Sequence, residues 1–447
     1  MRSVGQQRRR GSSRNRSGWT CCSATMAWRT RPLPLLLLLL FALALLFLLE
    51  CNCLSLICRI IAWNRSFPNL GAPIAKAPPL RFLGGESGHR NGKTYVSSRF
   101  YSDSVDGRTP PASPATTRRA PTSKQRGNLL LKILQTNARS RTFAKRTDDF
   151  FRGHRSGPPC KDRFFMAWIS SLEAFGPREL FSVESLFKSH PHACLLIVSN
   201  TMDSTLGSLL LKPFVERGFR VAAVSPDFTH LLKRTPAAPW FHRLRRREVS
   251  PGEVPLGQNL SNLLRLAVLY KYGGVYVDTD VIILKGFGGL RNTIGAQAVD
   301  AGTGNWTRLN NAVMVFDRRH PLLYKFLQEF AMTFDGNKWG HNGPYLVSRV
   351  AARIRGKPGY SFSVLPPPAF YPVGWNKIST LFSGPRNQSH SRWISENLGW
   401  IRGASYSLHL WNKQSSRIKV EEGSVISRIM LDSCVICNLS SSLVHKE

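Results

Sequence analysis

The chain has 447 residues, with 62 Lys+Arg against 26 Asp+Glu and a formal net charge of +36. Such a balance raises nucleic-acid binding as one class of function, but no nucleic-acid-binding motif accompanies the charge. Residues 1–31 and 64–147 contribute +21 of the excess, and residues from 148 onward contribute +15. A basic face for an anionic membrane surface or for a diphosphate therefore explains the charge better than DNA or RNA does.

An apolar run near the N-terminus predicts a membrane anchor. Leu33 to Leu49 is a 17-residue run broken only by Pro34. It spans about 26 Å as a helix, and residues up to 60 complete a bilayer core of about 30 Å. Eight arginines and no acid precede it, which predicts a cytoplasmic N-terminus. A cleaved signal peptide is the alternative, but its apolar region is usually about 7–15 residues long. We predict a cytoplasmic tail at 1–32 and an uncleaved signal anchor at 33–60.

The composition after the anchor predicts a stem in the secretory lumen. Residues 64–147 hold 16 Lys+Arg against 3 acids, and the stretch Thr109 to Lys124 is rich in Pro, Ser and Thr. Such a composition buries little apolar surface, so we expect residues 61–159 to be largely disordered.

Glycosylation sequons and cysteines fit a lumenal location. Four cysteines follow the stem region, and an even number in an oxidising compartment predicts two disulfides with three possible connectivities: Cys160, Cys194, Cys434 and Cys437. The last two form a CxxC pair that could instead be redox-active or bind zinc, but no second CxxC or His pair supports zinc. Five sequons begin at Asn64, Asn259, Asn305, Asn387 and Asn438.

Residues 160–447 read as one α/β domain with a mostly parallel sheet. Short apolar runs predict strands at 164–169, 194–199 and 219–225, and a helix is expected from Pro177 to Lys188. Strands that alternate with helices imply parallel pairing through crossover helices. Ligands in such sheets bind at the carboxyl ends of the strands.

The clearest chemical motif is Asp278-Thr279-Asp280. Apolar residues recur at helical spacing from Leu260 to Val268, and Gly273 stands where this helix should stop. A β-rich run follows and ends in two carboxylates at i and i+2, which a strand would direct to one face. Two such carboxylates suit Mg²⁺ or Mn²⁺, and the cation could also bind the diphosphate of a nucleotide sugar.

Other function classes share parts of this pattern. An isolated Asp-x-Asp is often a pair of solvated loop carboxylates, although the helix–turn–strand order before it is more specific. Phosphatases of the haloacid dehalogenase type also follow a strand with Asp-x-Asp, but near the start of their domain, whereas here it lies more than 100 residues in. A catalytically inactive or lectin-like membrane protein is a further alternative. A phosphatase would release phosphate, whereas a glycosyltransferase would release UDP. Hydrolysis of a donor with Mn²⁺ would distinguish an active transferase from an inactive or lectin-like protein.

Five sequence blocks together resemble one enzyme family. The block Ser261 to Asp280 resembles glycosyltransferase family 32, the sugar-binding DXD-motif enzymes. Later blocks are similar to its α1,4-glycosyltransferase branch, which includes globotriaosylceramide synthase: 309–316, 339–344, 367–372 and 409–413. The resemblance implies a GT-A-type nucleotide-sugar-binding fold, a UDP-sugar donor, Mn²⁺ or Mg²⁺, and a glycan or glycolipid acceptor. It also implies retention of anomeric configuration and a single-pass type II protein of the Golgi membrane.

The resemblance assigns catalytic and metal-binding roles to four residues. Asp280 would be a direct metal ligand, and Asp278 would contact the donor sugar or ribose and bind the metal through water. His409 would be the third metal ligand or a diphosphate contact, although a structural histidine is the alternative. Asn342 would lie under the anomeric carbon.

Donor-binding roles follow in the same way. Arg265 and Asn262 share a helix face and would meet the donor sugar or phosphate, with Tyr276 on the strand beside them. Members of the family often have Asp where this chain has Asn262, which leaves the donor sugar open. Trp168 would stack on uracil or else be a core aromatic, and Trp306 and Trp339 would stack on the acceptor or else be packing residues.

No carboxylate is evident as a nucleophile, because Asp278 and Asp280 are committed to metal. For a retaining transfer we therefore expect attack by the acceptor hydroxyl on the face that the UDP leaves, with a diphosphate oxygen as base. Metal and basic groups would stabilise the charge that builds on the departing UDP.

Overall fold

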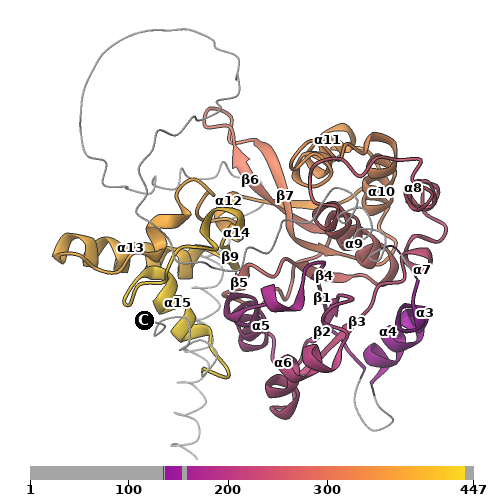
Figure 1. Ribbon diagram of the computed structural model, residues 1–447. Helices are drawn as coiled ribbons and strands as arrows, with labels where there is room; N and C mark the ends of the chain where they lie inside the picture. The colour runs from indigo at the N-terminus through magenta and orange to yellow at the C-terminus, as the bar shows by residue number, and fades with distance from the viewer. Residues whose placement is uncertain (1–133, 135, 154–158, 438–447) are drawn as a thin grey trace, which may run out of the picture. The chain divides into compact units, whose positions relative to one another are not determined.

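The computed structural model describes residue 134 and residues 136–153 and 159–437 (Figure 1). The predicted tail and anchor, and most of the predicted stem, lie outside these residues. Within the described part of the chain, no helix is long and apolar enough to cross a membrane.

Among the described residues, seven strands form the central sheet. Their order is β3-β2-β1-β4-β7-β6-β8, and all run parallel except β7, which is antiparallel to both neighbours. The strands span Arg163–Ala167 (β1), Cys194–Val198 (β2), Arg220–Val224 (β3), Gly274–Val277 (β4), Thr293–Val299 (β6), Trp306–Phe316 (β7) and Ser363–Leu365 (β8). A second sheet pairs β5 (Val281–Ile283) with β9 (Ser407–His409). The predicted α/β class with a mostly parallel sheet is confirmed.

Helices cover both faces of the large sheet (Figure 1). On one face lie α4 (Phe143–Arg152), α7 (Phe228–Leu232), α8 (Ala237–Arg245), α9 (Leu256–Tyr272), α10 (Pro321–Thr333) and α11 (Pro344–Ile354). On the other lie α5 (Pro177–Ser189), α6 (Thr205–Glu216) and α12 (Pro367–Phe370). The described residues also include α3 (Ala138–Arg141), α13 (Gln388–Ala404), α14 (Asn412–Ser415), α15 (Val425–Ser433) and the 3-10 turns Leu172–Ala174 and Ile378–Phe382.

The centre of the sheet is buried on both sides because strands β1, β2 and β4 are almost entirely apolar. In β1, Phe165 and Ala167 join the core under α9, whereas Phe164 and Met166 join the core under α5. Such a two-sided burial is typical of parallel sheets and explains why the strand sequences read as continuous apolar runs.

The helix and strand that flank the Asp-x-Asp motif form as the sequence predicts. Helix α9 ends at Tyr272, and Gly273 caps it with a φ of 67°. A Cβ at Gly273 would lie 2.5 Å from the backbone nitrogen of Arg318, and one at Gly274 would lie 2.4 Å from the carbonyl oxygen of Arg163. Both glycines are therefore required, because the chain reverses there between two neighbouring segments.

The ordered domain begins earlier than predicted, which corrects the boundary placed at residue 160. Helices α3 and α4 lie in the segment assigned to the stem, and Phe143 and Phe151 of α4 are buried in the main core. Arg146 binds Asp203 with two hydrogen bonds of 2.8 and 2.9 Å. The basic composition hid this amphipathic helix, whose apolar residues are aromatic and widely spaced.

The Arg146–Asp203 pair gives a pH-dependent contribution to stability. Burial acts to raise the pKa of the Asp203 carboxyl, but hydrogen bonds from Arg146 and Ser225 outweigh it and hold the pKa below its usual value. Because a lowered folded-state pKa stabilises the fold above the unfolded-state value, this contribution is lost as the pH falls below about 4. Asp203→Asn should lower the free energy of unfolding by about 1–3 kcal/mol in urea at pH 7 and weaken its dependence on pH below 4.

Asp432→Asn is the matched control for that substitution, because the Asp432 pair with Arg402 is half exposed on both sides. We expect a change below about 1 kcal/mol there. An equal loss in both variants would show that α4 is not held by its ion pair.

Both disulfides predicted from the cysteine count are present. Cys160 pairs with Cys194, which joins the segment before β1 to the start of β2, and Cys434 pairs with Cys437 after α15. The CxxC pair is thus a bridge and not part of a zinc cluster among the described residues.

Candidate active site

Asp278 and Asp280 lie side by side at the carboxyl end of β4, but not on a strand. Strand β4 ends at Val277, and Asp278 to Asp280 form a turn in which the Val281 N–H donates to the Asp278 carbonyl. The prediction that a strand directs both carboxylates to one face is therefore wrong. A tight turn brings Asp278 and Asp280 together instead. The Asp278 N–H still donates to Ala312 of β7 at 2.8 Å, which fixes the start of the turn against the sheet.

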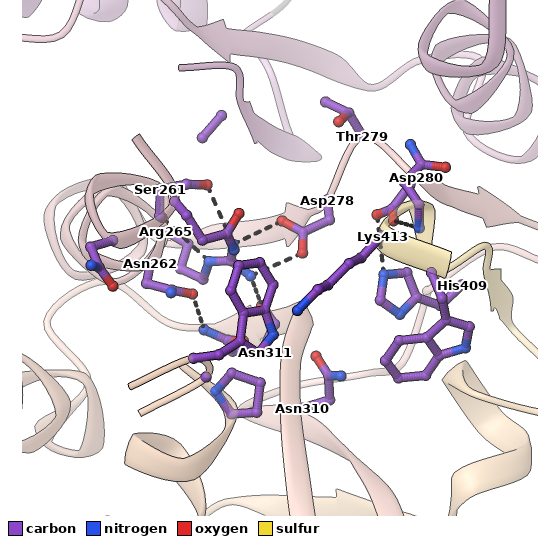
Figure 2. Close-up of a pocket in the computed structure, with 18 of the residues that line it drawn as sticks. Ser261, Asn262, Arg265, Asp278, Thr279, Asp280, Asn310, Asn311, His409 and Lys413 are labelled. Carbon is purple, nitrogen blue, oxygen red and sulfur yellow. Dashed lines mark hydrogen bonds and ion pairs between the residues drawn. The ribbon is translucent and has the colours of Figure 1, made fainter. Parts of the chain in front are cut away.

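His409 completes a three-residue cluster with the two carboxylates. It is the last residue of β9 and pairs with Val281, the residue after Asp280. Its Nε2 lies 3.1 Å from Asp280 Oδ1 (Figure 2). One ligand atom from each of Asp278, Asp280 and His409 lies within 4.8 Å of the others, so the group could hold a metal ion. The small β5–β9 sheet thus positions a residue 129 positions away in sequence.

The donor atoms of this cluster fit a divalent transition metal. Two carboxylates suit Mg²⁺ or Mn²⁺, and an imidazole favours the transition metal of the two. Burial acts to raise the pKa of Asp280, but His409 and the N–H of Asn412 outweigh it and lower that pKa. Asp280 is therefore ionised at neutral pH, as a metal ligand must be.

Arg265 binds both carboxylate oxygens of Asp278. Its Nη2 lies 3.0 Å from Asp278 Oδ1 and its Nη1 lies 3.1 Å from Oδ2, while Nη1 also donates to the Asn311 carbonyl at 2.7 Å (Figure 2). The side chain is 3% exposed and the remaining N–H groups face Ser261. Arg265 lines the cleft, and its hydrogen bonds go to Asp278, Asn311 and Ser261. The donor contact predicted for Arg265 stays a prediction.

Tyr276 lies one layer deeper than predicted. It is 1% exposed and does not line the cleft. Its hydroxyl donates to Asp278 Oδ1 at 2.8 Å, and its ring lies 4.7 Å from the Arg265 guanidinium carbon. The donor contact predicted for Tyr276 is therefore corrected to a positioning role, because its hydroxyl reaches Asp278 and not the cleft.

Asn342 is likewise removed from the cleft. It is 1% exposed, and its amide donates to Asn259 Oδ1 at 3.0 Å and to the Asp335 carbonyl at 2.8 Å. These bonds fix the turn at Gly336-Asn337 to helix α9. The predicted catalytic role under the anomeric carbon is thus wrong, and Asn342 supports the loop that carries Trp339.

A row of amides lines the cleft beside the carboxylates. Asn311 Nδ2 donates to Asn262 Oδ1 at 3.0 Å (Figure 2). Asn310 Nδ2 donates to Gln297 Oε1 at 3.0 Å. All four line the cleft. Gly343 packs on Asn262, since a Cβ there would lie 2.7 Å from its Oδ1. Asn262 therefore lines the cleft in close contact with Gly343, and its predicted contact with the donor stays a prediction.

The cleft that these residues line has a volume of about 590 Å³. Trp168, which follows β1, lies on its wall, where its Nε1 donates to the Ser171 carbonyl and its ring meets Phe175 edge-on. The cleft lies at the carboxyl ends of β1 and β4, where the parallel-sheet rule places a ligand. The predicted uracil contact of Trp168 stays a prediction.

Several residues that line the cleft were not predicted from the sequence as functional residues. Glu179 at the start of α5 accepts from Asn412 Nδ2 at 3.1 Å, and the Asn412 N–H donates to Asp280. Burial raises the pKa of Glu179, and the nearby Asp280 adds to this effect. Lys413 extends into the cleft, with its Nζ 3.8 Å from the centre of the Trp339 ring (Figure 2). The Asn-Lys pair after His409 was part of a recognised block and could have signalled these contacts.

Aromatic side chains form the rim of the cleft. Trp339, Trp375 and Tyr345 are 49%, 50% and 44% exposed. Among the exposed large hydrophobic side chains of the described residues, these three are aromatic and Tyr324 is the remaining aromatic one. Exposed rings are therefore concentrated at the rim of the cleft. Trp306, the other candidate for stacking, is partly buried against the core and does not line the cleft.

Two known family descriptions match this chain, and together they cover the residues of the Asp278–Asp280–His409 cluster. The family description "Alpha 1,4-glycosyltransferase conserved region" matches residues 315–440, and "Glycosyltransferase sugar-binding region containing DXD motif" matches residues 176–300. A lactosylceramide 4-alpha-galactosyltransferase of Mus musculus is 32% identical over 58% of this chain and 70% of its own length. An alpha-1,4-N-acetylglucosaminyltransferase of Homo sapiens is 26% identical over 59% of this chain and 74% of its own length.

An uncharacterised protein of Arabidopsis thaliana is 33% identical over 67% of this chain, which spans only 45% of that protein's length. Among solved structures, the galactosyltransferase LgtC in complex with donor and acceptor sugar analogs has a TM-score of 0.35 at 10% identity, over 64% of this chain and 97% of that one. The resemblance expected from the sequence blocks is confirmed by the two family matches.

Proposed function

Because the chain belongs to the alpha 1,4-glycosyltransferase family, we propose that it transfers a hexosyl or N-acetylhexosaminyl group from a UDP-sugar to a glycan or glycolipid acceptor. The linkage is α1,4, the anomeric configuration is retained, and the domain is of GT-A type. The observation that carries the proposal is the cluster of Asp278, Asp280 and His409 on the floor of a cleft.

Mn²⁺ at this cluster would bind the diphosphate and neutralise the charge that develops on the departing UDP. Asp280 and His409 would hold the ion directly. Asp278 accepts hydrogen bonds from Arg265 and Tyr276 on both of its oxygens, which suits contact with the ion through water. Lys413 reaches into the same space and adds a positive charge for the diphosphate.

The donor sugar would lie against the amide row. Asn262, Asn310 and Gln297 are neutral groups that both donate and accept hydrogen bonds, as sugar hydroxyls do. The neutral Asn262 in this position leaves the choice between galactose, N-acetylglucosamine and other UDP-sugars to experiment. Relatives named for galactosyl and N-acetylglucosaminyl transfer make these two donors the first to try.

The acceptor would approach over the aromatic rim. Exposed rings with a polar edge, such as Trp339 and Trp375, bind the apolar face of a sugar while the surrounding polar groups bind its hydroxyls. Attack on the face that UDP leaves requires no enzyme nucleophile. Glu179 lines the cleft and accepts a hydrogen bond from Asn412, whose N–H donates to Asp280, so it would orient the metal site.

The test is a screen of UDP release by the purified chain across UDP-sugars, with and without acceptor. We expect one or two UDP-sugars to be hydrolysed in Mn²⁺, and EDTA to stop the release. A folded protein that releases UDP from none of them, and transfers none of them, would favour the inactive or lectin-like alternative.

We further propose a single-pass type II topology in the Golgi membrane, with residues from about 61 in the lumen. Protease added to sealed vesicles should then remove only about the first 30 residues. Digestion of the catalytic domain by that protease would reverse the proposed orientation.

Glycan attachment offers a sharper test of lumenal exposure. Asn387 is exposed at the start of α13, whereas Asn259 is 2% exposed and accepts a hydrogen bond from Asn342. Ser389→Ala removes the sequon at Asn387 and keeps the Asn387 side chain as the helix cap. This variant should therefore lower the mass of the cellular protein by one glycan. Asn259→Gln should leave the number of glycans unchanged. Equal, glycosidase-insensitive masses for Ser389→Ala and the unaltered protein would contradict the proposal.

A further inference from the structure

A second cleft opens at the opposite edge of the sheet from the active site. It has a volume of about 490 Å³ and is lined by Arg163 at the start of β1, Tyr272 before β4 and Arg318 after β7. These are the amino ends of the parallel strands, whereas Trp168 and Asp278 mark the carboxyl ends. This second cleft is therefore separate from the proposed donor site, and its ligand must be a different molecule.

The charge of the second cleft is strongly positive. Arg152, Arg163, Lys271 and Arg318 line it, with Asp148 as the acid in the lining. Arg152 is already paired with Asp149, and Arg318 has no hydrogen-bond or ion-pair partner among the described residues. Lys271 donates to the His230 carbonyl at 3.0 Å, which leaves further N–H donors of its ammonium group. The cleft thus holds more positive charge than its own acid can balance.

Two glycines allow the backbone segments that carry these cations to approach each other closely. Gly273 lets the Arg318 backbone approach within a distance that any Cβ would block, and Gly274 does the same for Arg163. Arg319, the next residue, takes a left-handed conformation with φ 60° and donates its N–H to the Tyr270 carbonyl. The Arg163 guanidinium is held over the Phe151 ring at 5.2 Å. Close packing therefore fixes the backbones of Arg163 and Arg318 beside the end of α9, which carries Lys271.

Like charges at such proximity repel each other. Burial lowers the pKa of Lys271, and the neighbouring Lys233 and Arg318 lower it further. An anion between these side chains would relieve the repulsion. Two guanidinium groups and an ammonium group match the oxygens of a phosphate, since arginine binds such groups through paired N–H donors.

We propose that the second cleft binds a phosphate group. The same chemistry is offered by a phospholipid headgroup and by a soluble phosphate. Helix α4, which carries Asp148, Phe151 and Arg152 of the lining, lies near the start of the described residues, which follow the predicted anchor in the sequence. The proposal does not depend on the glycosyltransferase function, because it uses none of the residues of the active site.

The test is the thermal unfolding midpoint of the full chain in EDTA, at constant ionic strength set with sodium chloride. The added probes are inorganic phosphate, dihexanoyl phosphatidic acid, and dihexanoyl phosphatidylcholine as the neutral comparison. At a probe concentration about tenfold above Kd, we expect the midpoint to rise by about 2–4 °C. A rise with both acidic probes identifies a general phosphate site, and a rise with phosphatidic acid alone identifies a lipid headgroup site.

Variants tie the effect to this cleft. Lys271→Met with Arg318→Gln should abolish the rise, whereas the control pair Lys419→Met with Arg392→Gln removes the same charge from exposed positions elsewhere and should keep it. Arg163→Gln serves as a second cleft variant if the first pair lowers the midpoint without any probe. Equal shifts in the cleft and control variants, or no shift beyond that of chloride with either acidic probe, would overturn the proposal. UDP release should be unchanged in the cleft variants.

Discussion

Asp280→Ala is expected to reduce sugar transfer by a factor on the order of 10³ or more. Asp280 is the carboxylate that contacts His409 and also accepts the N–H of Asn412, so its loss removes a proposed metal ligand and releases the loop that carries Lys413. Its side chain is 15% exposed, and the unpaired Asn412 N–H should cost about 1–3 kcal/mol of stability.

Asp280→Asn separates these two effects. The amide keeps an acceptor for Asn412 and hence the fold, but it is a poor metal ligand. Both variants should be inactive at saturating Mn²⁺, with Asp280→Asn close to normal in its unfolding midpoint. Asp432→Ala is the control, since it removes an exposed carboxylate outside the cleft. Turnover near that of the unaltered protein in either Asp280 variant would exclude Asp280 as a metal ligand.

Arg265→Ala should have the second largest effect, on both stability and activity. Removal of the guanidinium leaves the Asp278 carboxylate, which is 24% exposed, without its charge partner, at a cost of up to about 3–5 kcal/mol. Asp278 would then shift, and small displacements of a catalytic group commonly cost about 10²-fold in rate. Arg265→Lys should recover only part of both losses, because an ammonium group cannot bind two carboxylate oxygens and the Asn311 carbonyl at once.

The metal dependence distinguishes this positioning role from simple loss of stability. The Mn²⁺ concentration for half-maximal activity, measured well below the unfolding midpoint, should rise in Arg265→Lys. Arg349→Ala is the matched control, because Arg349 forms a partly buried ion pair with Glu329 outside the cleft. It should lower stability and leave the Mn²⁺ requirement unchanged. An unchanged Mn²⁺ requirement in Arg265→Lys would mean that Arg265 serves the fold alone.

The sequence predicted β1, β2, β3 and β4 well because these strands are short apolar runs and because Gly273 and Gly274 stand at a required turn. Helix α9, Gly273 and β4 form where expected, and the local spacing of Asp278 and Asp280 was sufficient to place them at a strand end. The motif itself adopts a turn, because Asp278 bonds to β7 while Val281 begins a different sheet. That second sheet, which brings His409 to Asp280, depends on pairing over a long separation that no local pattern shows.

The residues that were misplaced share one physical reason. Tyr276 and Asn342 belong to recognised blocks, but a block does not reveal which of its members face the cleft and which lie behind them. Tyr276 supports Asp278, and Asn342 supports the loop of Trp339, through bonds to partners distant in the sequence. The helix at 143–152 was missed for another reason, since its basic residues resemble those of the preceding segment and its two buried rings are not a long apolar stripe.

The most direct test of the account is the product of transfer from the preferred UDP-sugar to a glycolipid with a terminal galactose, in Mn²⁺, analysed by nuclear magnetic resonance. We predict an α-anomeric product with the new bond at the 4-hydroxyl, formed by the unaltered protein and not by Asp280→Asn. A β-anomeric product, or an α product formed equally well by Asp280→Asn, would contradict it.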